Sequence, residues 1–255
     1  MEYNTIIVDE RDLVGRITFN RPPVNILNIE MMREINDALK SFQVRKLRVL
    51  VLDANGKAFS AGVDVSDHMG GKADEMIRVF HAIFHNMSMI EAPIVALVKG
   101  AALGGGCEVV AFCDLVLASD RAKFGQPEIK VGVFPPVAAA IFPKIMPYKR
   151  ALELLLTGDI IKADEARNLG LVNQIFPFDT FEADAERFIR EKIACNSAVV
   201  LRLTKKAFVE GASNNYHEAM VKIEDIYLSE LMLSKDANEG LEAFIEKRPP
   251  KWIDE

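Results

Sequence analysis

The sequence has few of the features that mark secreted, membrane-spanning or nucleic-acid-binding proteins. Its 255 residues include three cysteines, Cys107, Cys113 and Cys195, and an odd number without metal-like spacing favours reduced thiols in a cytosolic protein. No uninterrupted apolar stretch approaches the roughly 18 residues that a membrane span needs, and the acidic N-terminus lacks the apolar segment of a secretion signal. The net charge of −6, with no basic block, argues against a nucleic-acid surface. We therefore expect a soluble, cytoplasmic protein that binds neither nucleic acid nor a membrane.

What the sequence does have is a hydrophobic fraction of 50%, enough for one large domain or a domain with a smaller appendage. Up to about residue 148, short apolar runs alternate with helical patterns. Residues 5–8 and 14–19 are typical of an opening hairpin, and Asn28 is a suitable N-cap for a helix from Ile29. Strands are predicted at 47–53 and 93–100, and helices at about 72–90 and from the glycines after residue 103 to Phe112. This alternation predicts an α/β fold of β-α units with parallel strand pairing.

After about residue 148 the pattern is mainly helical, with long amphipathic stretches near 180–194, 197–210 and 215–233. The last helix is predicted to start at Asp236, because Glu239 three residues later completes a pattern resembling a capping box, and to stop before Pro249. No tandem sequence repeat is visible. We expect a core over residues 1–195 and a helical C-terminal region over 196–255.

Three consecutive glycines, Gly104 to Gly106, stand between an apolar run and a helical pattern. Glycine loses more conformational entropy on folding than other residues, so a triplet requires an explanation. One explanation is close packing of a helix against a strand. Another is a helix N-terminus whose free N–H groups hold a negatively charged atom. The dinucleotide pattern and the P-loop lysine are missing, which leaves an oxyanion as the second candidate. The triplet alone leaves both explanations open.

A second small-residue loop and two glutamates favour the oxyanion explanation. The stretch N-G-K-A-F-S-A-G-V-D-V-S (55–66) follows a predicted strand, at the end where α/β sheets bind ligands. Glu108 lies in the first turn after the glycines, and Glu128 follows a proline in F-G-Q-P-E-I. Either glutamate alone is explained by a helix dipole or by solvation. Together with two loops that offer backbone amides, they indicate proton transfer next to a thioester or ketone carbonyl.

With these motifs the chain resembles the crotonase, or enoyl-CoA hydratase/isomerase, superfamily along nearly its whole length. The resemblance rests on F-N-R-P, K-A-F-S-A-G-V-D, K-G-A-A-L-G-G-G-C-E, C-D-L-V-L-A-S, F-G-Q-P-E-I, L-T-G-D, A-R-N-L-G-L-V and E-K-R-P-P-K, in this order. It implies a crotonase-like spiral of ββα units with a C-terminal helical domain that builds homo-trimers, often paired into homo-hexamers.

The resemblance also implies an enzyme, a hydratase-type lyase, and roles for particular residues. The amides of Val63 and Gly105 would hold the thioester oxygen, while Glu108 and Glu128 would activate water and deliver the proton. Coenzyme A is then part of the substrate, and no metal or further cofactor is expected. Arg21, Lys57 and Lys251 are candidates for its phosphates, with no basis for a choice. The substrate-binding positions implied are Ala61, Asp64, Val65, Ser66, Gly104 and Pro136.

One departure from the family pattern concerns the water. Pro136 stands where family hydratases have a glycine whose N–H helps to hold the catalytic water, and proline has no N–H. The segment G-V-F-P-P-V-A-A-A, together with R-P-P-V-N-I-L-N, resembles a narrower group that hydrates cyclohexa-1,5-diene-1-carbonyl-CoA in anaerobic aromatic degradation. That substrate is therefore favoured. The alternatives are a general enoyl-CoA hydratase of fatty acid β-oxidation, an enoyl-CoA double-bond isomerase, and a non-catalytic acyl-CoA-binding protein.

Overall fold

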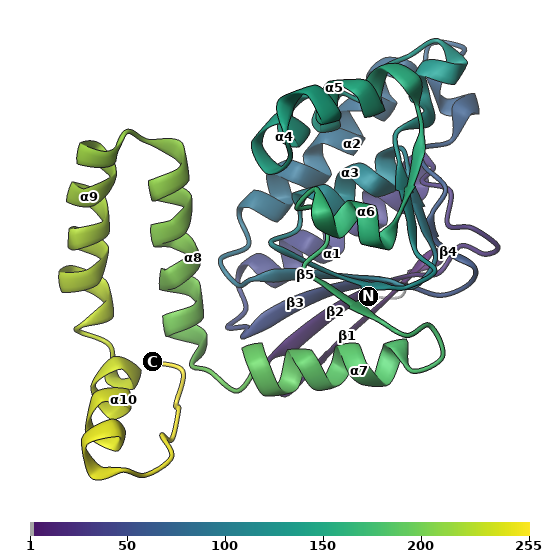
Figure 1. Ribbon diagram of the computed structural model, residues 1–255. Helices are drawn as coiled ribbons and strands as arrows, with labels where there is room; N and C mark the ends of the chain where they lie inside the picture. The colour runs from purple at the N-terminus through teal and green to yellow at the C-terminus, as the bar shows by residue number, and fades with distance from the viewer. Residues whose placement is uncertain (1–2) are drawn as a thin grey trace.

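The structure is a computed structural model that describes residues 3–255 (Figure 1). The strands are β1 Ile6–Arg11, β2 Val14–Phe19, β3 Val49–Ala54, β4 Ala58–Ser60, β5 Ile94–Val98, β6 Ala101–Leu103, β7 Leu115–Ser119, β8 Lys123–Gly125, β9 Ile160–Lys162 and β10 Gln174–Phe176. The α-helices are α1 Ile29–Gln43, α2 Ala73–Ser88, α3 Gly105–Phe112, α4 Pro136–Ile145, α5 Tyr148–Thr157, α6 Ala163–Asn168, α7 Phe181–Phe188, α8 Ala198–Ser213, α9 Tyr216–Asp225 and α10 Lys235–Glu246. Short 3-10 helices η1 Val65–His68 and η2 Pro127–Val131 follow β4 and β8, and π-helical turns η3 Ile189–Ile193 and η4 Ile226–Leu231 extend α7 and α9.

From β3 to β8 the chain places its strands alternately in two sheets. One sheet has six strands in the order β1-β2-β3-β5-β7-β10, and the other has four in the order β4-β6-β8-β9. The predicted hairpin is confirmed, since β1 and β2 pair antiparallel with Ile6 opposite Phe19. From β2 to β10 the pairing in the larger sheet is parallel, as predicted.

Three successive units repeat the same path through these sheets. The units β3-β4-α2, β5-β6-α3 and β7-β8-α4 each place one strand in the six-stranded sheet, one in the four-stranded sheet and then a helix. Parallel neighbours require such crossovers, because a short turn cannot join them. The expected spiral of ββα units is therefore confirmed.

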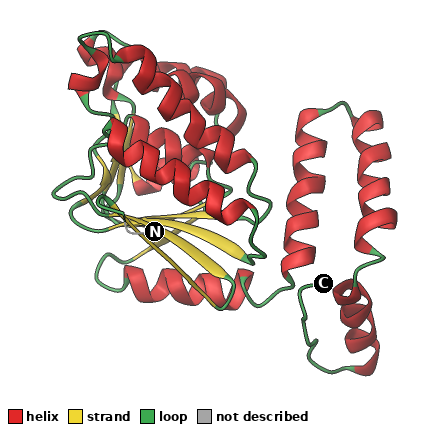
Figure 2. Cartoon of the chain, turned by 180° about the vertical axis from the view of Figure 1, so that it is seen from behind, coloured by secondary structure: helices red, strands yellow, loops and turns green. Residues whose placement is uncertain are grey.

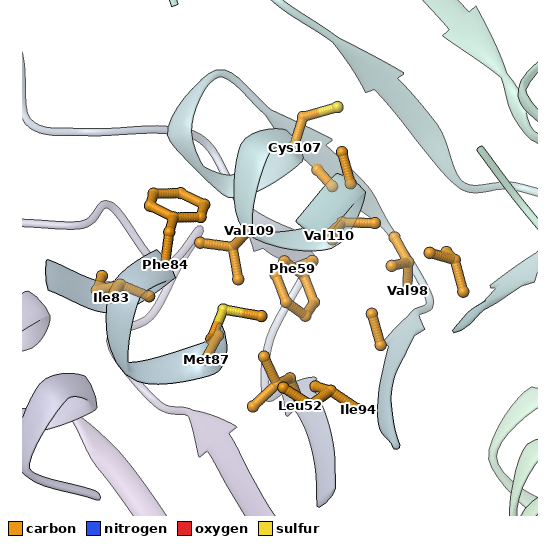
Figure 3. Packing of buried hydrophobic residues seen from close by; sticks show 14 of the residues in the cluster. Leu52, Phe59, Ile83, Phe84, Met87, Ile94, Val98, Cys107, Val109 and Val110 are labelled. Carbon is orange, nitrogen blue, oxygen red and sulfur yellow. The ribbon is translucent and has the colours of Figure 1, made fainter. Parts of the chain in front are cut away.

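Helices cover both faces of the six-stranded sheet (Figure 1). Val49 and Val51 of β3 pack with Phe181 of α7 on one face, while Leu50 and Leu52 belong to the core formed with α1, α2 and α3 on the other. Burial on both faces explains why residues 49–52 of β3 are all apolar rather than alternating with polar residues. Figure 3 shows α3 in the larger core, packed between α2 and the strands.

Helices α8 to α10 extend away from the sheets (Figure 2). Lys205 of α8 is held at the core by the carbonyls of Ile90 and Ala92, both at 3.0 Å from its Nζ, and by Asp114 at 2.7 Å. Because such contacts join the two parts, the predicted division at residue 195 stays a prediction. Within residues 3–255, no helix combines the length and apolar character needed to cross a membrane.

The predicted start of the last helix is wrong. The N-cap of α10 is Ser234, whose side chain accepts from the amide of Ala237. Asp236 instead lies fully buried in the first turn, where its two carboxylate oxygens accept from the amides of Ile253 and Asp254, each at 2.9 Å. The C-terminal tail turns back onto α10. A capping pattern describes only neighbouring residues, so it could not predict this contact.

Candidate active site

Three loops meet at one edge of the four-stranded sheet. Strands β4, β6 and β8 are parallel neighbours and end at Ser60, Leu103 and Gly125. The carboxyl ends of adjacent parallel strands lie side by side, at the usual ligand-binding edge of an α/β sheet. The loop after β4 carries Val63, the helix after β6 carries Gly105 and Glu108, and the 3-10 helix after β8 carries Glu128. The topology therefore brings the four principal predicted residues to one place.

Gly104 sits at the contact between the glycine loop and Glu128. Its φ of +51° lies in the region that favours glycine. A β-carbon at this position would lie 2.5 Å from Oε1 of Glu128. Its N–H donates to the carbonyl of Gly125 at 2.9 Å, which ties β6 to β8. Glycine is needed here so that the carboxyl group can approach the backbone.

The other two glycines serve close packing. A β-carbon on Gly105 would lie 2.7 Å from Cγ2 of Val63, and one on Gly106 would lie 2.5 Å from Cβ of Ser60. Helix α3 is thus pressed against the loop and the end of β4. Gly105 also provides the first amide of α3, which has no acceptor within its own helix. Close packing therefore explains Gly105 and Gly106, and the free first amide at Gly105 leaves the oxyanion explanation as a prediction.

The Val63 loop is aligned by an isolated parallel bridge with Leu27. Leu27 donates its N–H to the carbonyl of Gly62 at 2.9 Å and accepts from the amide of Asp64 at 3.0 Å. In parallel pairing, the residue between these two bonding positions directs its own N–H to the opposite side. The Val63 amide is therefore directed away from the bridge, where a ligand atom can meet it.

Asn25 is a structural residue of this site that the sequence analysis missed. Its fully buried side chain donates to the carbonyls of Asn55 and Ala58 at 2.8 and 2.9 Å and accepts from the amide of Arg21 at 2.8 Å. It thereby holds both ends of the turn that leads into β4. A signal was available, because its φ of +52° is one that asparagine tolerates better than most residues, and it lies within R-P-P-V-N-I-L-N.

Glu108 is buried, with 2% of its surface exposed, and is held by the N-terminus of α4. Its Oε1 accepts from the amides of Val137 and Ala138, both at 2.8 Å. Burial raises the pKa of Glu108 to about 7; the two amides oppose this rise, and the charge of Glu128 adds to it. Glu108 can therefore gain or release a proton near neutral pH, as a general acid or base requires.

Glu128 lies in η2, and burial raises the pKa of its carboxyl group as well. Gln126, a fully buried side chain that the sequence analysis did not single out, is its neighbour. With the amide nitrogen facing the carboxylate, Gln126 donates to Oε2 of Glu128 and to the carbonyl of Gly104, each at 3.2 Å. Its position between a strand end and a proline was the only sign in the sequence.

The remaining predicted positions lie along the same edge. Ala61, Val65 and Ser66 are exposed, and Asp64 caps η1 by accepting from the amide and hydroxyl of Ser66 at 3.0 and 2.8 Å. These bonds from Ser66 lower the pKa of Asp64. Pro136 is the first residue of α4, directly before the amides that bind Glu108.

The ββα units and the helical C-terminal part give the chain the crotonase fold. The solved structure of enoyl-CoA hydratase subunit I from Geobacillus kaustophilus is similar over the whole of both chains, with a TM-score of 0.92 and 33% sequence identity. A family model described as enoyl-CoA hydratase/isomerase matches residues 9–255. The chain belongs to the enoyl-CoA hydratase/isomerase family.

Two curated relatives support this membership. The chain is 37% identical over 238 residues to the cyclohexa-1,5-dienecarbonyl-CoA hydratase of Thauera aromatica, covering 93% of this chain and 92% of that protein. It is 34% identical over 256 residues to a probable enoyl-CoA hydratase of Mycobacterium tuberculosis, covering 99% of each. The expectation of an enzyme of the hydratase class of lyases is confirmed by these relatives.

Proposed function

We propose that this protein adds water to an α,β-unsaturated acyl-CoA thioester. The observation that carries the proposal is the meeting of two carboxyl groups of raised pKa with the first amide of α3 at one sheet edge. In this proposal the amides of Val63 and Gly105 hold the thioester oxygen. As water adds to the β-carbon, negative charge moves to that oxygen, and donors fixed in advance stabilise it.

The two carboxyl groups take different parts in the proposed reaction. The two amides of α4 favour the charged form of Glu108, which suits it to accept a proton as the oxygen of water bonds to the β-carbon. Glu128, whose pKa is raised by burial and whose carboxyl group accepts from the side-chain amide of Gln126, passes its proton to the carbon chain as the enolate collapses. Transfer of the proton from Glu108 to Glu128 returns both carboxyl groups to their starting states before the next turnover.

The favoured substrate is cyclohexa-1,5-diene-1-carbonyl-CoA. It is supported by the Thauera aromatica relative and by the proline at position 136, where the family pattern has glycine. A general enoyl-CoA hydratase activity is the second candidate, supported by the Mycobacterium tuberculosis relative at 34% identity. A double-bond isomerase is the third: the missing amide at Pro136 favours it, because proton relocation needs no bound water, and the second carboxyl group argues against it.

A substrate panel in ¹⁸O-labelled water tests these candidates. Crotonyl-CoA and the cyclic dienoyl-CoA are each supplied, and products are analysed by mass spectrometry. A hydratase places labelled oxygen in the product, and the preferred substrate has the larger kcat/KM. An isomerase moves the double bond without label. Tight binding of acyl-CoA with no turnover across the panel would overturn the proposal in favour of a binding protein.

We also infer that the chain forms a homo-trimer or homo-hexamer in the cytoplasm. Large apolar side chains of the C-terminal helices are exposed, including Phe208 at 76% and Phe244 at 84%. Surfaces of this kind are typical of protein interfaces. The reduced state of the three cysteines, which form no disulfide in the structure, supports the location. Light scattering of the purified protein gives the number of subunits directly, and a monomer at micromolar concentration would contradict this inference.

A further inference from the structure

Helix α4 begins with a residue that cannot donate. Pro136 is its first residue and has no N–H, so the first free amides of the helix are those of Val137 and Ala138. Both donate to the same atom, Oε1 of Glu108. Within residues 3–255, the other oxygen, Oε2, has no hydrogen-bond donor. One oxygen of this carboxylate is therefore fully occupied, and the other is free.

We propose that α4 positions Glu108 for proton transfer, and that Pro136 sets its basicity by limiting the helix to two donors, both bound to Oε1. Oε2 is then the oxygen that takes the proton from water. This inference rests on the proposed hydration and assigns to Pro136 a positioning role that makes no contact with the reacting atoms. A non-proline residue at 136 would add a third free amide to the first turn, beside the carboxylate.

The surroundings of Glu108 make its pKa sensitive to the number of amides that bind its carboxylate. Among the described residues, Glu128 in η2 is the charged side chain that acts on it, and the neighbouring Cys107 thiol is neutral because burial raises its pKa to about 12. Helix α2 presents Ile83, Phe84 and Met87 to α3, all apolar (Figure 3). No cation balances the carboxylate there, so the amides of α4 are its stabilising partners, and one more amide is a large fractional change.

The test compares two proline-to-alanine substitutions in the same helix. Pro136→Ala adds an N–H beside Glu108, whereas Pro143→Ala adds one in the later part of α4 and serves as the matched control. We expect Pro136→Ala to move the acid limb of the kcat/KM profile down by about one pH unit, because a hydrogen bond to the charged form lowers a carboxyl pKa. At high pH its kcat should fall several-fold, because the anion is a weaker base. A rise in kcat would instead indicate that the restored N–H holds the water, as in the family pattern, and would overturn the role proposed for Pro136.

A second measurement does not depend on turnover. Carbon-13 NMR of labelled glutamate carboxyl groups follows the titration of Glu108, assigned by the signal that Glu108→Gln removes. The same downward shift should appear in Pro136→Ala and in Pro136→Gly, which also restores the N–H and guards against a misfolded variant. Pro143→Ala should leave the titration unchanged.

The outcomes separate this inference from the proposed function. An unchanged titration in both variants at position 136, or an equal shift in Pro143→Ala, would overturn the role of Pro136. A shifted titration in a protein that hydrates no acyl-CoA would leave α4 as the element that sets the pKa of Glu108 and would reject its part in water activation.

Discussion

The ββα core buries its largest apolar side chains, whereas the C-terminal helices leave several of theirs exposed to solvent. In the core, large residues such as Phe19, Phe59 and Phe124 are at most 1% exposed. In α8 and α10, Phe208 and Phe244 are 76% and 84% exposed, and few residues are fully buried. The core contains the two carboxyl groups of the candidate site, whereas the C-terminal helices expose apolar surface that another subunit could cover. Substitutions in the two regions should therefore have separable effects, on chemistry in one and on assembly in the other.

The largest effect is expected for Glu108→Gln in the core. Loss of one general acid–base group should reduce kcat by about 10²–10⁴-fold, with acyl-CoA affinity and subunit number unchanged. Steady-state kinetics, calorimetric binding and light scattering measure the three quantities. Glu224→Gln, in an exposed position of α9, is the control with the same chemical change. Undiminished turnover in Glu108→Gln would remove this residue from the mechanism.

A smaller loss is expected for Gly104→Ala. The new β-carbon would lie 2.5 Å from Oε1 of Glu128 and must displace that carboxyl group. A displacement of about 1 Å can cost about 10²-fold in rate. Gly132→Ala is a partial control: its φ of +84° is also positive, but its ψ of 17° places it in the milder left-handed helical region, and no atom lies within 4 Å of the new β-carbon. Equal losses in the two variants would indicate that strain alone is responsible.

In the C-terminal region, Phe244→Asp should weaken assembly and leave the fold of the core intact. A buried aromatic anchor at an interface contributes about 2 kcal/mol or more, so the dissociation constant of the assembly should rise by about 30-fold. Sedimentation velocity over a dilution series measures this. Val44→Asp provides the comparison, since Val44 is 89% exposed on the core just after α1. An unaltered assembly in Phe244→Asp would place the interface elsewhere.

The smallest effect concerns stability and pH. Burial raises the pKa of Glu108 from 4.5 to about 7, so the folded state binds its proton more tightly than the unfolded state does. The stability from this proton is fully present below pH 4.5 and is lost as pH rises to about 7. Glu108→Gln should thus raise Tm by a few degrees at pH 8, and by less at pH 5. Differential scanning calorimetry at both values checks the sign, and a lower Tm at pH 8 would contradict it.

The long elements and the cap of α1 were predictable from local patterns, whereas the cap of α10 and the ββα repeat were not. Asn28 caps α1 as expected, with its side chain accepting from Met31 at 3.0 Å. The ββα repeat stayed hidden because β4, β6 and β8 are only three residues long each and share no sequence motif. Patterns of two-residue or 3.6-residue period need longer segments to be detected.

The main residues of the candidate site were predictable through the family resemblance. The residues that hold them in place were not. Asn25 binds carbonyls 30 and 33 residues away, and Gln126 links Glu128, two residues further on, to the carbonyl of Gly104 just after β6. The two amides that α4 gives to Glu108 likewise depend on a contact across about 30 positions. Such partners are fixed by the packing of whole units, which no short motif encodes.

The distribution of the site over three successive units has a consequence for the newly made chain. Val63 belongs to the first unit, Glu108 to the second, and Glu128 to the third, with α4 following as the support of Glu108. A polypeptide still emerging from the ribosome therefore lacks a paired acid and base until the last of these segments has been synthesised and docked. Catalytic competence would then report that these three units have docked, and products truncated before α4 would be inert.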